Sequence, residues 1–215
     1  MVENESVRED KMEPLAYRMK PTKLEDFYGQ EDIVGKDKLL YRLIKADKLT
    51  SAIFWGPPGC GKTSLARVIA STTKNKFVTL NATTSGVSDI KSVVEEAQNI
   101  FTNPTGKVIL FIDEIHRFNK LQQDALLPHV EKGTVILIGA TTENPYFSVN
   151  KALISRSTVF KFKALEDKDI VKILNNCISD SENGLGKYNL EVKDDALEYI
   201  SMCSNGDVST ALNEL

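Results

Sequence analysis

The sequence predicts an α/β protein in which a mostly parallel five-stranded sheet lies between helices. Short apolar runs, each of strand length, alternate with amphipathic stretches that have helical spacing. After about residue 165 the strand-like runs stop and only helical patterns follow. The chain has 215 residues, of which 41% are hydrophobic and 27% charged, so it can bury a core of ordinary size.

Five apolar runs predict the strands. The run at 108–112 is continuously apolar and rich in β-branched residues, which is typical of a central strand buried on both faces. The others lie at 51–55, 77–80, 134–139 and 159–162. Because helical patterns separate these strands, the connections predict a parallel sheet covered on both faces.

Amphipathic stretches predict the helices at 36–47, 64–70, 88–101, 121–131, 167–179 and 194–203, with one more from about Asp207. Thr22 and Glu25 form a capping-box pattern, which predicts a short helix there. Pro128 predicts a kink or an early end in the helix that contains it.

Composition excludes several classes of protein. The formal net charge is −3, so the chain is not a generally basic nucleic-acid binder, although a local basic face stays possible. No run approaches the roughly 18 apolar residues of a membrane span, and the acidic, polar N-terminus is not a signal peptide. We therefore expect a cytoplasmic protein without a membrane partner, whose residues 1–13 form a disordered tail.

The cysteines and histidines suggest no metal site. The cysteines stand at 60, 177 and 203 without framework spacing, which favours a reducing compartment over disulfides or zinc. We expect His116 and His129 to be surface or helix-end residues.

A phosphate-binding motif lies between the first predicted strand and the next helix. Residues 56–63 read GPPGCGKT and match the P-loop pattern G-x-x-x-x-G-K-[ST] in the strand–loop–helix context that the motif requires. Glycines let the backbone N–H groups approach phosphate oxygens, Lys62 can reach the β- and γ-phosphates, and Thr63 can ligate magnesium. The predicted ATP-binding residues here are Gly56, Pro57, Pro58, Gly59, Cys60, Gly61, Lys62, Thr63 and Ser64.

Two carboxylates follow the central strand. Asp113 and Glu114 come directly after the apolar run, at the edge of an open α/β sheet where ligands bind. Asp113 can hold Mg²⁺ and Glu114 can accept a proton from an attacking water. Such a pair is weak evidence alone, but after a P-loop it predicts Mg-ATP hydrolysis. Thr142, with Thr141 as the alternative, follows the neighbouring strand and could contact the γ-phosphate.

The P-loop and the acidic pair together resemble those of the AAA+ ATPases of the clamp-loader-like branch. Three longer stretches resemble the replication-associated recombination protein A family, which includes the Werner-helicase-interacting protein: residues 14–21 leading to 29–35, residues 113–131 and residues 139–147. The resemblance extends over residues 14–215. It implies a nucleotide-binding domain at 14–164 and a helical lid at 165–215 that is incomplete because the helical pattern still runs at Leu215.

The resemblance also implies a function. By this resemblance, the protein is expected to be a DNA-dependent ATPase that acts in replication-fork maintenance, recombination and repair. It is also expected to associate with the nucleoid at replication forks. The implied cofactors are ATP and Mg²⁺. The implied partners are single-stranded, gapped or forked DNA, single-strand DNA-binding protein, and further copies of the chain in a homo-oligomer.

Several residue roles come from the resemblance alone. Arg156 matches the arginine finger that reaches a neighbouring subunit's γ-phosphate, so Glu114, Arg156, Thr142 and Lys62 form the catalytic set. Tyr17, Arg18, Ile33 and Val34 match the segments that contact adenine, and Asn81 matches a polar residue that restrains Glu114.

Two positions depart from the family's pattern. Cys60 stands where threonine is usual, and we expect its side chain to point away from the phosphates and its thiol to be open to oxidation. Ser209 stands where related proteins usually carry a lid arginine that acts on the γ-phosphate.

Two other functions stay open. The chain could be a clamp-loader subunit or a Holliday-junction branch-migration ATPase, which share the core motifs but lack the long run after Asp113. It could also be a nucleotide-gated DNA-binding scaffold with little hydrolysis, which Ser209 favours and the presence of Glu114 and Arg156 opposes.

Overall fold

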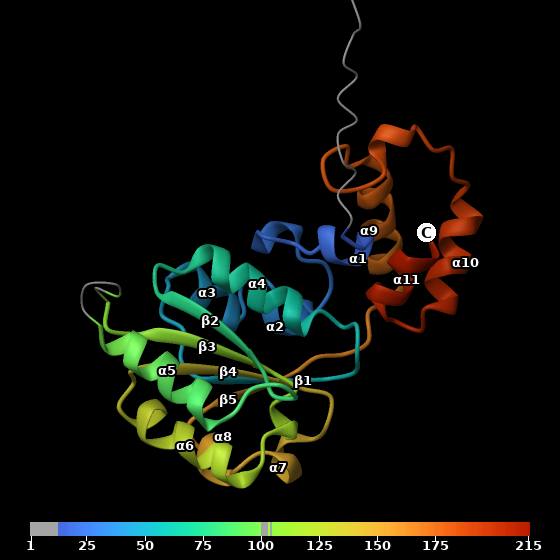
Figure 1. The fold of residues 1–215 in the computed structure, drawn as a ribbon. Helices are drawn as coiled ribbons and strands as arrows, with labels where there is room; N and C mark the ends of the chain where they lie inside the picture. Colours follow the sequence, from blue (N-terminus) through green and yellow to red (C-terminus); the bar gives the residue numbers. More distant parts are fainter. Residues whose placement is uncertain (1–12, 100–102, 104) are drawn as a thin grey trace, which may run out of the picture.

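The computed structural model describes residues 13–99, 103 and 105–215. A five-stranded parallel sheet with the order β2-β3-β4-β1-β5 lies between two helical layers, and a helical lobe stands beyond one edge of it (Figure 1). The predicted α/β fold with a parallel sheet is confirmed. Most of the predicted tail at 1–13 and the end of the predicted helix at 88–101 lie outside the described residues.

The strands form where the apolar runs predict them, within one or two residues at most ends. Because side chains alternate along a strand, Ile53 and Phe54 enter the cores on opposite faces of the sheet. Every carboxyl end points to the same edge. The strands are β1 (Ala52–Trp55), β2 (Lys76–Asn81), β3 (Val108–Asp113), β4 (Val135–Thr141) and β5 (Thr158–Lys161).

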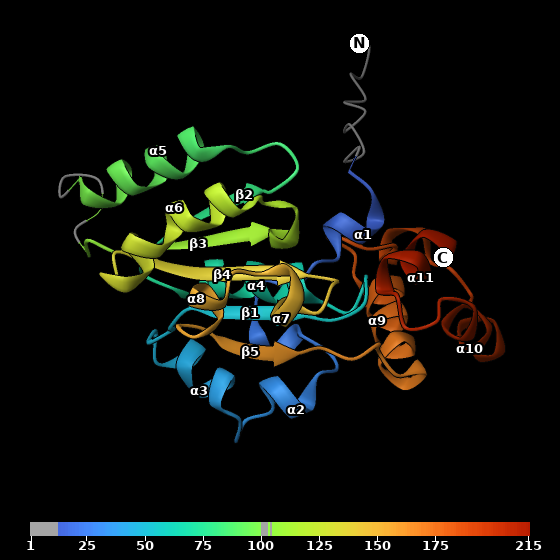
Figure 2. The same cartoon turned by 90° about the horizontal axis from the view of Figure 1, so that it is seen from below.

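Helices cover both faces of the sheet (Figure 2). One face packs against α2 (Glu31–Val34), α3 (Leu39–Lys45) and α4 (Lys62–Thr72). The other packs against α5 (Val87–Gln98), α6 (Lys120–Glu131) and α8 (Lys151–Ile154), and α7 (Pro145–Ser148) precedes α8. Among the described residues, no helix is long and apolar enough to traverse a bilayer.

The helical lobe has its own hydrophobic cluster. It consists of α9 (Asp167–Ser179), α10 (Asp194–Cys203) and α11 (Val208–Glu214), with a 3-10 turn at Gly186–Tyr188. The N-terminal helix α1 (Leu15–Arg18) joins it, because Leu15, Ala16 and Met19 pack against this cluster. Helix α1 therefore packs against the lobe, the following residues form the sheet and its helices, and the last three helices form the lobe itself.

One local prediction is wrong, and one of the two alternatives predicted at Pro128 does not occur. Thr22 does not cap a helix, because the element there is a 3-10 turn at Leu24–Asp26 whose N-cap is Lys23, and Glu25 pairs with Lys45 instead. The predicted early end at Pro128 does not occur, since α6 continues to Glu131. Its N-terminus carries a complete capping box between Asn119 and Gln122.

Candidate functional site

The P-loop joins the end of β1 to the start of α4. Gly59 and Gly61 have φ angles of +62° and +99°, a conformation in which a side chain would be strained. The helix begins at Lys62, which is only 7% exposed. Its ammonium group donates to the carbonyl oxygens of Gly56 at 2.8 Å and Pro57 at 2.6 Å. The loop thus presents helix N–H groups and a buried cation in one place.

The acidic pair lies beside the P-loop. The Thr63 hydroxyl donates to Asp113 Oδ2 at 3.3 Å, which joins the two predicted magnesium ligands. Glu114 has a φ angle of +56°, so the chain turns sharply there and a 3-10 turn follows at Ile115–Arg117. The Glu114 amide donates to Asp113 Oδ1 at 3.1 Å.

Oxygen donors at this point fit a hard divalent cation. A hydroxyl and a carboxylate are the ligands that magnesium takes at P-loop sites, where the remaining positions are filled by water and phosphate oxygens. Among the described residues, no group of three or more histidine, cysteine or acidic side chains is placed to form an all-protein metal cage. Thr63 and Asp113 therefore suit an ion that arrives with a phosphate ligand.

The end of β4 supplies the third part of the site. Thr142 is exposed and lines the same cavity as Lys62 and Glu114. Thr141, the alternative in the sequence, is fully buried, and its hydroxyl contacts His116 Nδ1 at 3.0 Å and accepts from the Glu143 amide. Of the two threonines, only Thr142 lines the cavity.

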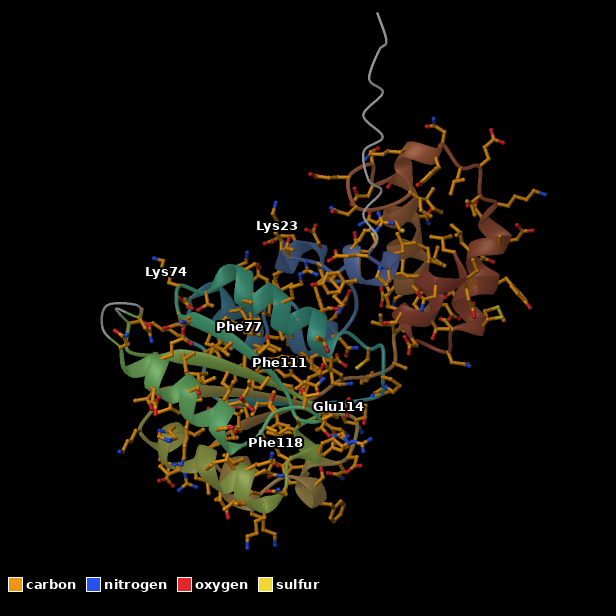
Figure 3. The ribbon with its side chains drawn as sticks, viewed as in Figure 1. Lys23, Lys74, Phe77, Phe111, Glu114 and Phe118 are labelled. Carbon is orange, nitrogen blue, oxygen red and sulfur yellow. The ribbon has the colours of Figure 1, made fainter. Side chains whose placement is uncertain are left out.

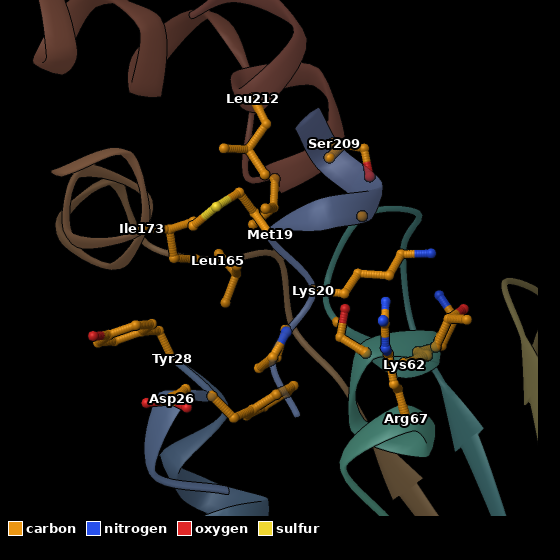
Figure 4. A pocket seen from close by; sticks show the side chains of 18 of the residues that line it. Met19, Lys20, Asp26, Tyr28, Lys62, Arg67, Leu165, Ile173, Ser209 and Leu212 are labelled. Atoms are coloured by element: carbon orange, nitrogen blue, oxygen red, sulfur yellow. The ribbon is translucent and has the colours of Figure 1, made fainter. Parts of the chain in front are cut away.

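A cavity of about 550 Å³ lies between the P-loop edge of the sheet and the helical lobe. Figure 3 places Glu114 at the carboxyl edge of the sheet, and Figure 4 shows the cavity from close by. P-loop residues Pro58, Gly59, Gly61, Lys62, Thr63 and Ser64 line it, with Asp113, Glu114 and Thr142. Gly56, Pro57 and Cys60 belong to the loop but not to this lining.

The lining has an apolar side and a basic side (Figure 4). Apolar side chains come mostly from the lobe, namely Met19, Leu165, Ile173 and Leu212. Basic side chains face the P-loop, namely Lys20, Lys62 and Arg67. The sequence pattern did not indicate the apolar set, because those residues meet only when the lobe folds against the sheet.

The predicted adenine contacts are divided between the cavity and the core. Arg18 lines the cavity. Tyr17 is not in the lining, but its ring lies 5.0 Å from Lys20 Nζ and 5.2 Å from Arg67 Cζ, and its carbonyl accepts from Arg67. Ile33 and Val34 are buried in the cluster beneath the sheet, so the structure does not bring these two apolar side chains to the cavity.

Arg156 lies far from the chain's own cavity. It comes two residues before β5, whose first residue Thr158 pairs with Ala52 at the start of β1, whereas the P-loop follows the end of β1. Its guanidinium pairs with Glu131 at 2.7 Å and donates to the Ala152 carbonyl at 2.9 Å, and it is absent from the cavity lining. Arg156 therefore has no contact with the nucleotide cavity of its own chain.

His116 was expected to be a surface or helix-end residue; it lies in the 3-10 turn at Ile115–Arg117 but is not on the surface. Its side chain is only 5% exposed, because the turn after Glu114 folds it against Thr141. Its Nε2 lies 3.2 Å from Glu114 Oε2. Asn81 pairs in register with Asp113, but its side-chain oxygen accepts from the Thr83 amide and hydroxyl. The contact to Glu114 thus comes from His116.

His129 is in the last turn of α6, which confirms its helix-end position.

Cys60 is buried, and its thiol lies 3.7 Å from Lys62 Nζ. Burial raises the pKa of the Cys60 thiol despite the neighbouring ammonium, which disfavours the thiolate. Burial and the raised pKa both disfavour the expected oxidation of this thiol. Ser209 does line the cavity, next to Val208, whose amide donates to the Gly59 carbonyl at 3.3 Å.

The Gln30 side chain connects the P-loop to the segment that follows β5. Its side chain donates to the carbonyls of Cys60 at 3.2 Å and Lys163 at 2.6 Å and accepts from the Lys163 amide. Sequence reasoning missed this role. The signal available was the glycine before it, since Gly29 has a φ angle of +74° and prepares the turn that aims Gln30 at the loop.

The family model for AAA, the ATPase family associated with various cellular activities, matches residues 52–165, which include the P-loop, the acidic pair and Thr142. The chain belongs to the AAA family. Within it, the chain is 50% identical over 202 residues to the replication-associated recombination protein A of Coxiella burnetii, and 44% identical over 203 residues to the ATPase WRNIP1 of Dictyostelium discoideum. The resemblance to that group is confirmed.

The matches cover 94% of this chain in both cases but only 45% and 23% of the two relatives, so the chain spans less than half of their length. A solved structure with a similar fold is the RuvB Holliday junction branch migration motor of Thermotoga maritima. Its TM-score is 0.73 with 26% sequence identity, over 91% of this chain and 63% of that one.

Proposed function

We propose that the protein binds ATP with Mg²⁺ in the cavity beside the P-loop and hydrolyses it to ADP and phosphate. The observation that carries this proposal is the convergence of three chain segments on one cavity. The P-loop follows β1, Thr142 follows β4 and the Asp113–Glu114 pair lies at the end of β3, and these three strands are neighbours in the sheet. Family membership supports the same reaction.

The two sides of the cavity suit the two ends of a nucleotide. Lys62 and the P-loop amides would take the phosphates, and the carbonyls of Gly56 and Pro57 would give up the ammonium to phosphate oxygens. The apolar side would take the purine, with Tyr28 also in the lining. A volume of about 550 Å³ is in the range of small-molecule sites.

The residues at the carboxyl edge divide the chemistry among them. Thr63 and Asp113 would hold Mg²⁺, which supplies charge neutralisation on the phosphates. Glu114 would take the proton of the water whose oxygen attacks the γ-phosphorus as the bond to the bridging oxygen breaks. Thr142 would donate to a γ-phosphate oxygen. Each of these side chains lines the cavity, as the division requires.

Arg156 would complete the cavity of a neighbouring copy. Its side chain is 40% exposed and lies beyond the opposite end of the strands, so it could serve only another subunit. The pairing with Glu131 is exposed and holds the guanidinium weakly enough to be exchanged for a phosphate. Active protein would then be an oligomer whose sites are shared between chains.

The biological setting follows from the relatives' names. The names support an ATPase that works in replication and recombination. We further propose that its turnover depends on DNA and that DNA and single-strand DNA-binding protein are its partners at replication forks, as the family resemblance implies. Residues 165–215 would act as the lid that reports the nucleotide state. Branch migration is the second candidate, because the structural match is to a branch-migration motor. Assays with forked DNA and with Holliday junctions would separate the two functions.

Phosphate release with and without DNA tests the proposal. The samples are the parent protein, Glu114→Gln, Arg156→Ala and an equal mixture of the two variants, with Arg42→Ala as a control at an exposed arginine of α3. Each single variant should lose about 10³-fold or more in turnover, while Arg42→Ala should keep it. The mixture should regain activity, because an intact Glu114 can meet an intact Arg156 from the other variant.

Three results would contradict parts of the proposal. Equal turnover by the parent and Glu114→Gln would favour a nucleotide-gated scaffold over an ATPase. No recovery in the mixture would remove the shared site. Rates unaffected by DNA would remove the DNA dependence and leave the hydrolysis intact.

A further inference from the structure

His116 connects the acidic pair to the end of β4. Its imidazole is nearly fully buried and contacts two polar groups on opposite sides of the ring. Nδ1 lies 3.0 Å from the Thr141 hydroxyl, and Nε2 lies 3.2 Å from Glu114 Oε2. Glu143, the residue after Thr142, offers Nε2 a more distant carboxylate at 3.7 Å. One side chain therefore links Glu114 with the segment that carries Thr142.

The position of the ring proton depends on the hydrogen bonds of the Thr141 hydroxyl. That hydroxyl accepts from the Glu143 amide at 3.0 Å, and its own proton has two acceptors in reach, His116 Nδ1 at 3.0 Å and the Glu143 carbonyl at 3.3 Å. When Nδ1 accepts from the hydroxyl, the ring carries a proton on Nε2, which is the nitrogen that faces Glu114.

We propose that His116 is a positioning residue, which holds the Glu114 carboxylate in orientation for the attacking water and ties it to the segment that carries Thr142. The proposal rests on hydrolysis at this cavity with Glu114 as the base. An Nε2–H directed at one carboxylate oxygen would restrict the side chain, while the other oxygen stays free to accept a proton. Such contacts often tighten only when substrate is bound.

The geometry argues for more than packing. An apolar side chain would fill the space under the turn, yet both ring nitrogens contact polar groups, and one of those groups is the proposed base. Asn81, which pairs with Asp113 on the neighbouring strand, has its side-chain oxygen engaged by Thr83. His116 is thus the buried side chain placed to set the position of Glu114.

Three substitutions separate positioning from packing. His116→Phe keeps the ring volume but removes both nitrogens. His116→Gln keeps a donor near the place of Nε2, while His116→Asn keeps a polar group near Nδ1 that is too short to reach Glu114. We measure kcat and KM for ATP in the presence of DNA, ATP affinity, and thermal unfolding, for the parent, each variant, Glu114→Gln, and the His116→Phe/Glu114→Gln double variant.

We expect kcat to fall about 10- to 100-fold in the Phe and Asn variants and to recover substantially in the Gln variant, with ATP affinity unchanged. The double variant should be no slower than Glu114→Gln alone, since a residue that acts through Glu114 has nothing further to lose. The unfolding temperatures of the Gln and Asn variants should be similar, which makes that pair the matched comparison if the Phe variant is unstable.

Several outcomes would overturn the inference. One is a kcat equal to the parent's in the Asn variant, and another is equal loss in the Asn and Gln variants together with weaker ATP binding. A loss in the double variant that equals the product of the single losses would also contradict it.

If Glu114→Gln keeps full turnover, the proposed base is wrong and the positioning role falls with it. If Glu114→Gln is inactive while His116→Phe equals the parent, only the positioning role is lost.

Discussion

Single residues of the cavity lining set the charge that a nucleotide would meet. Lys62, Lys20 and Arg67 lie on the P-loop side, whereas the α11 residues that line the same cavity, Val208, Ser209 and Leu212, are uncharged. The amide beside it, that of Val208, donates to the P-loop carbonyl of Gly59. A cation at position 209 would therefore enter the cavity from the helical lobe.

Replacing Ser209 with arginine should strengthen ATP binding about tenfold. A new charge-assisted hydrogen bond to phosphate contributes about 1.5–3 kcal/mol, and solvent at this exposed position reduces that figure. The measurement is the dissociation constant for Mg-ATP at moderate salt. Thr210→Arg is the matched control, since the next residue adds the same charge outside the cavity lining. Equal effects of the two substitutions would show that only the overall charge matters.

The same scale shows where sequence reasoning succeeds and where it stops. Lys62, Thr63, Asp113, Glu114 and Thr142 all line the cavity, because strand-end positions of a parallel sheet fix them by topology. The burial of His116 was not predictable, since it depends on Thr141, which is distant in sequence. Ile33 and Val34 carry no local mark that separates a core position from an adenine contact.

At the scale of elements, strands were easier to predict than short helices. Each strand is a compact apolar run. The alternation of predicted strands and helices along the chain correctly indicated a parallel sheet, because parallel neighbours need a connection that crosses over the sheet. The four-residue helices α1, α2, α7 and α8 were missed, since one turn leaves no periodic pattern. The Thr22–Glu25 pattern misled because Glu25 has a tertiary partner in Lys45.

The carboxylate of Asp47 holds the loop that connects α4 to β2. Asp47 follows α3, and its side chain accepts from the Thr73 hydroxyl at 2.5 Å, the Lys74 amide at 2.9 Å and the Asn75 amide group at 3.4 Å. Burial raises the pKa of Asp47, but these hydrogen bonds outweigh it and hold the pKa below its ordinary value. The charged form therefore stabilises the folded state.

Asp47→Asn should lower the stability at neutral pH by about 1 kcal/mol, a small figure because the group is partly solvated. Asparagine tolerates the positive φ of 50° at this position, so the change removes charge without backbone strain. A depressed pKa contributes stability above the ordinary carboxyl pKa and loses it as the pH falls through the folded value. The difference in unfolding temperature between parent and variant should thus shrink in acid.

Thermal unfolding across a pH series checks this prediction. Asp37→Asn serves as the control, because Asp37 is an exposed carboxylate that precedes α3 in the chain. A pH-independent difference between the parent and Asp47→Asn would mean that the charge of Asp47 contributes nothing.

At the scale of the whole molecule, the cavity forms where three separate parts of the chain pack against one another. The N-terminal segment supplies Arg18 and Lys20, the sheet edge supplies the P-loop and the acidic pair, and the lobe supplies Leu165, Ile173 and Leu212. The predicted fold class and family are confirmed, but the lobe's share of the lining was invisible in the sequence. Packing of the lobe's cluster, including Met19 of the N-terminal segment, brings those surfaces together.

The most direct test of the account is the affinity of the protein for Mg-ATP before and after Lys62→Ala. Lys62 is the buried cation of the cavity, so its removal should weaken binding at least about tenfold while the fold persists. Lys74→Ala, at an exposed lysine of the same chain, should bind as the parent does (Figure 3). Equilibrium binding of ATP with unfolding curves for all three proteins decides the matter. Unchanged affinity in a folded Lys62→Ala variant would contradict the proposed nucleotide site.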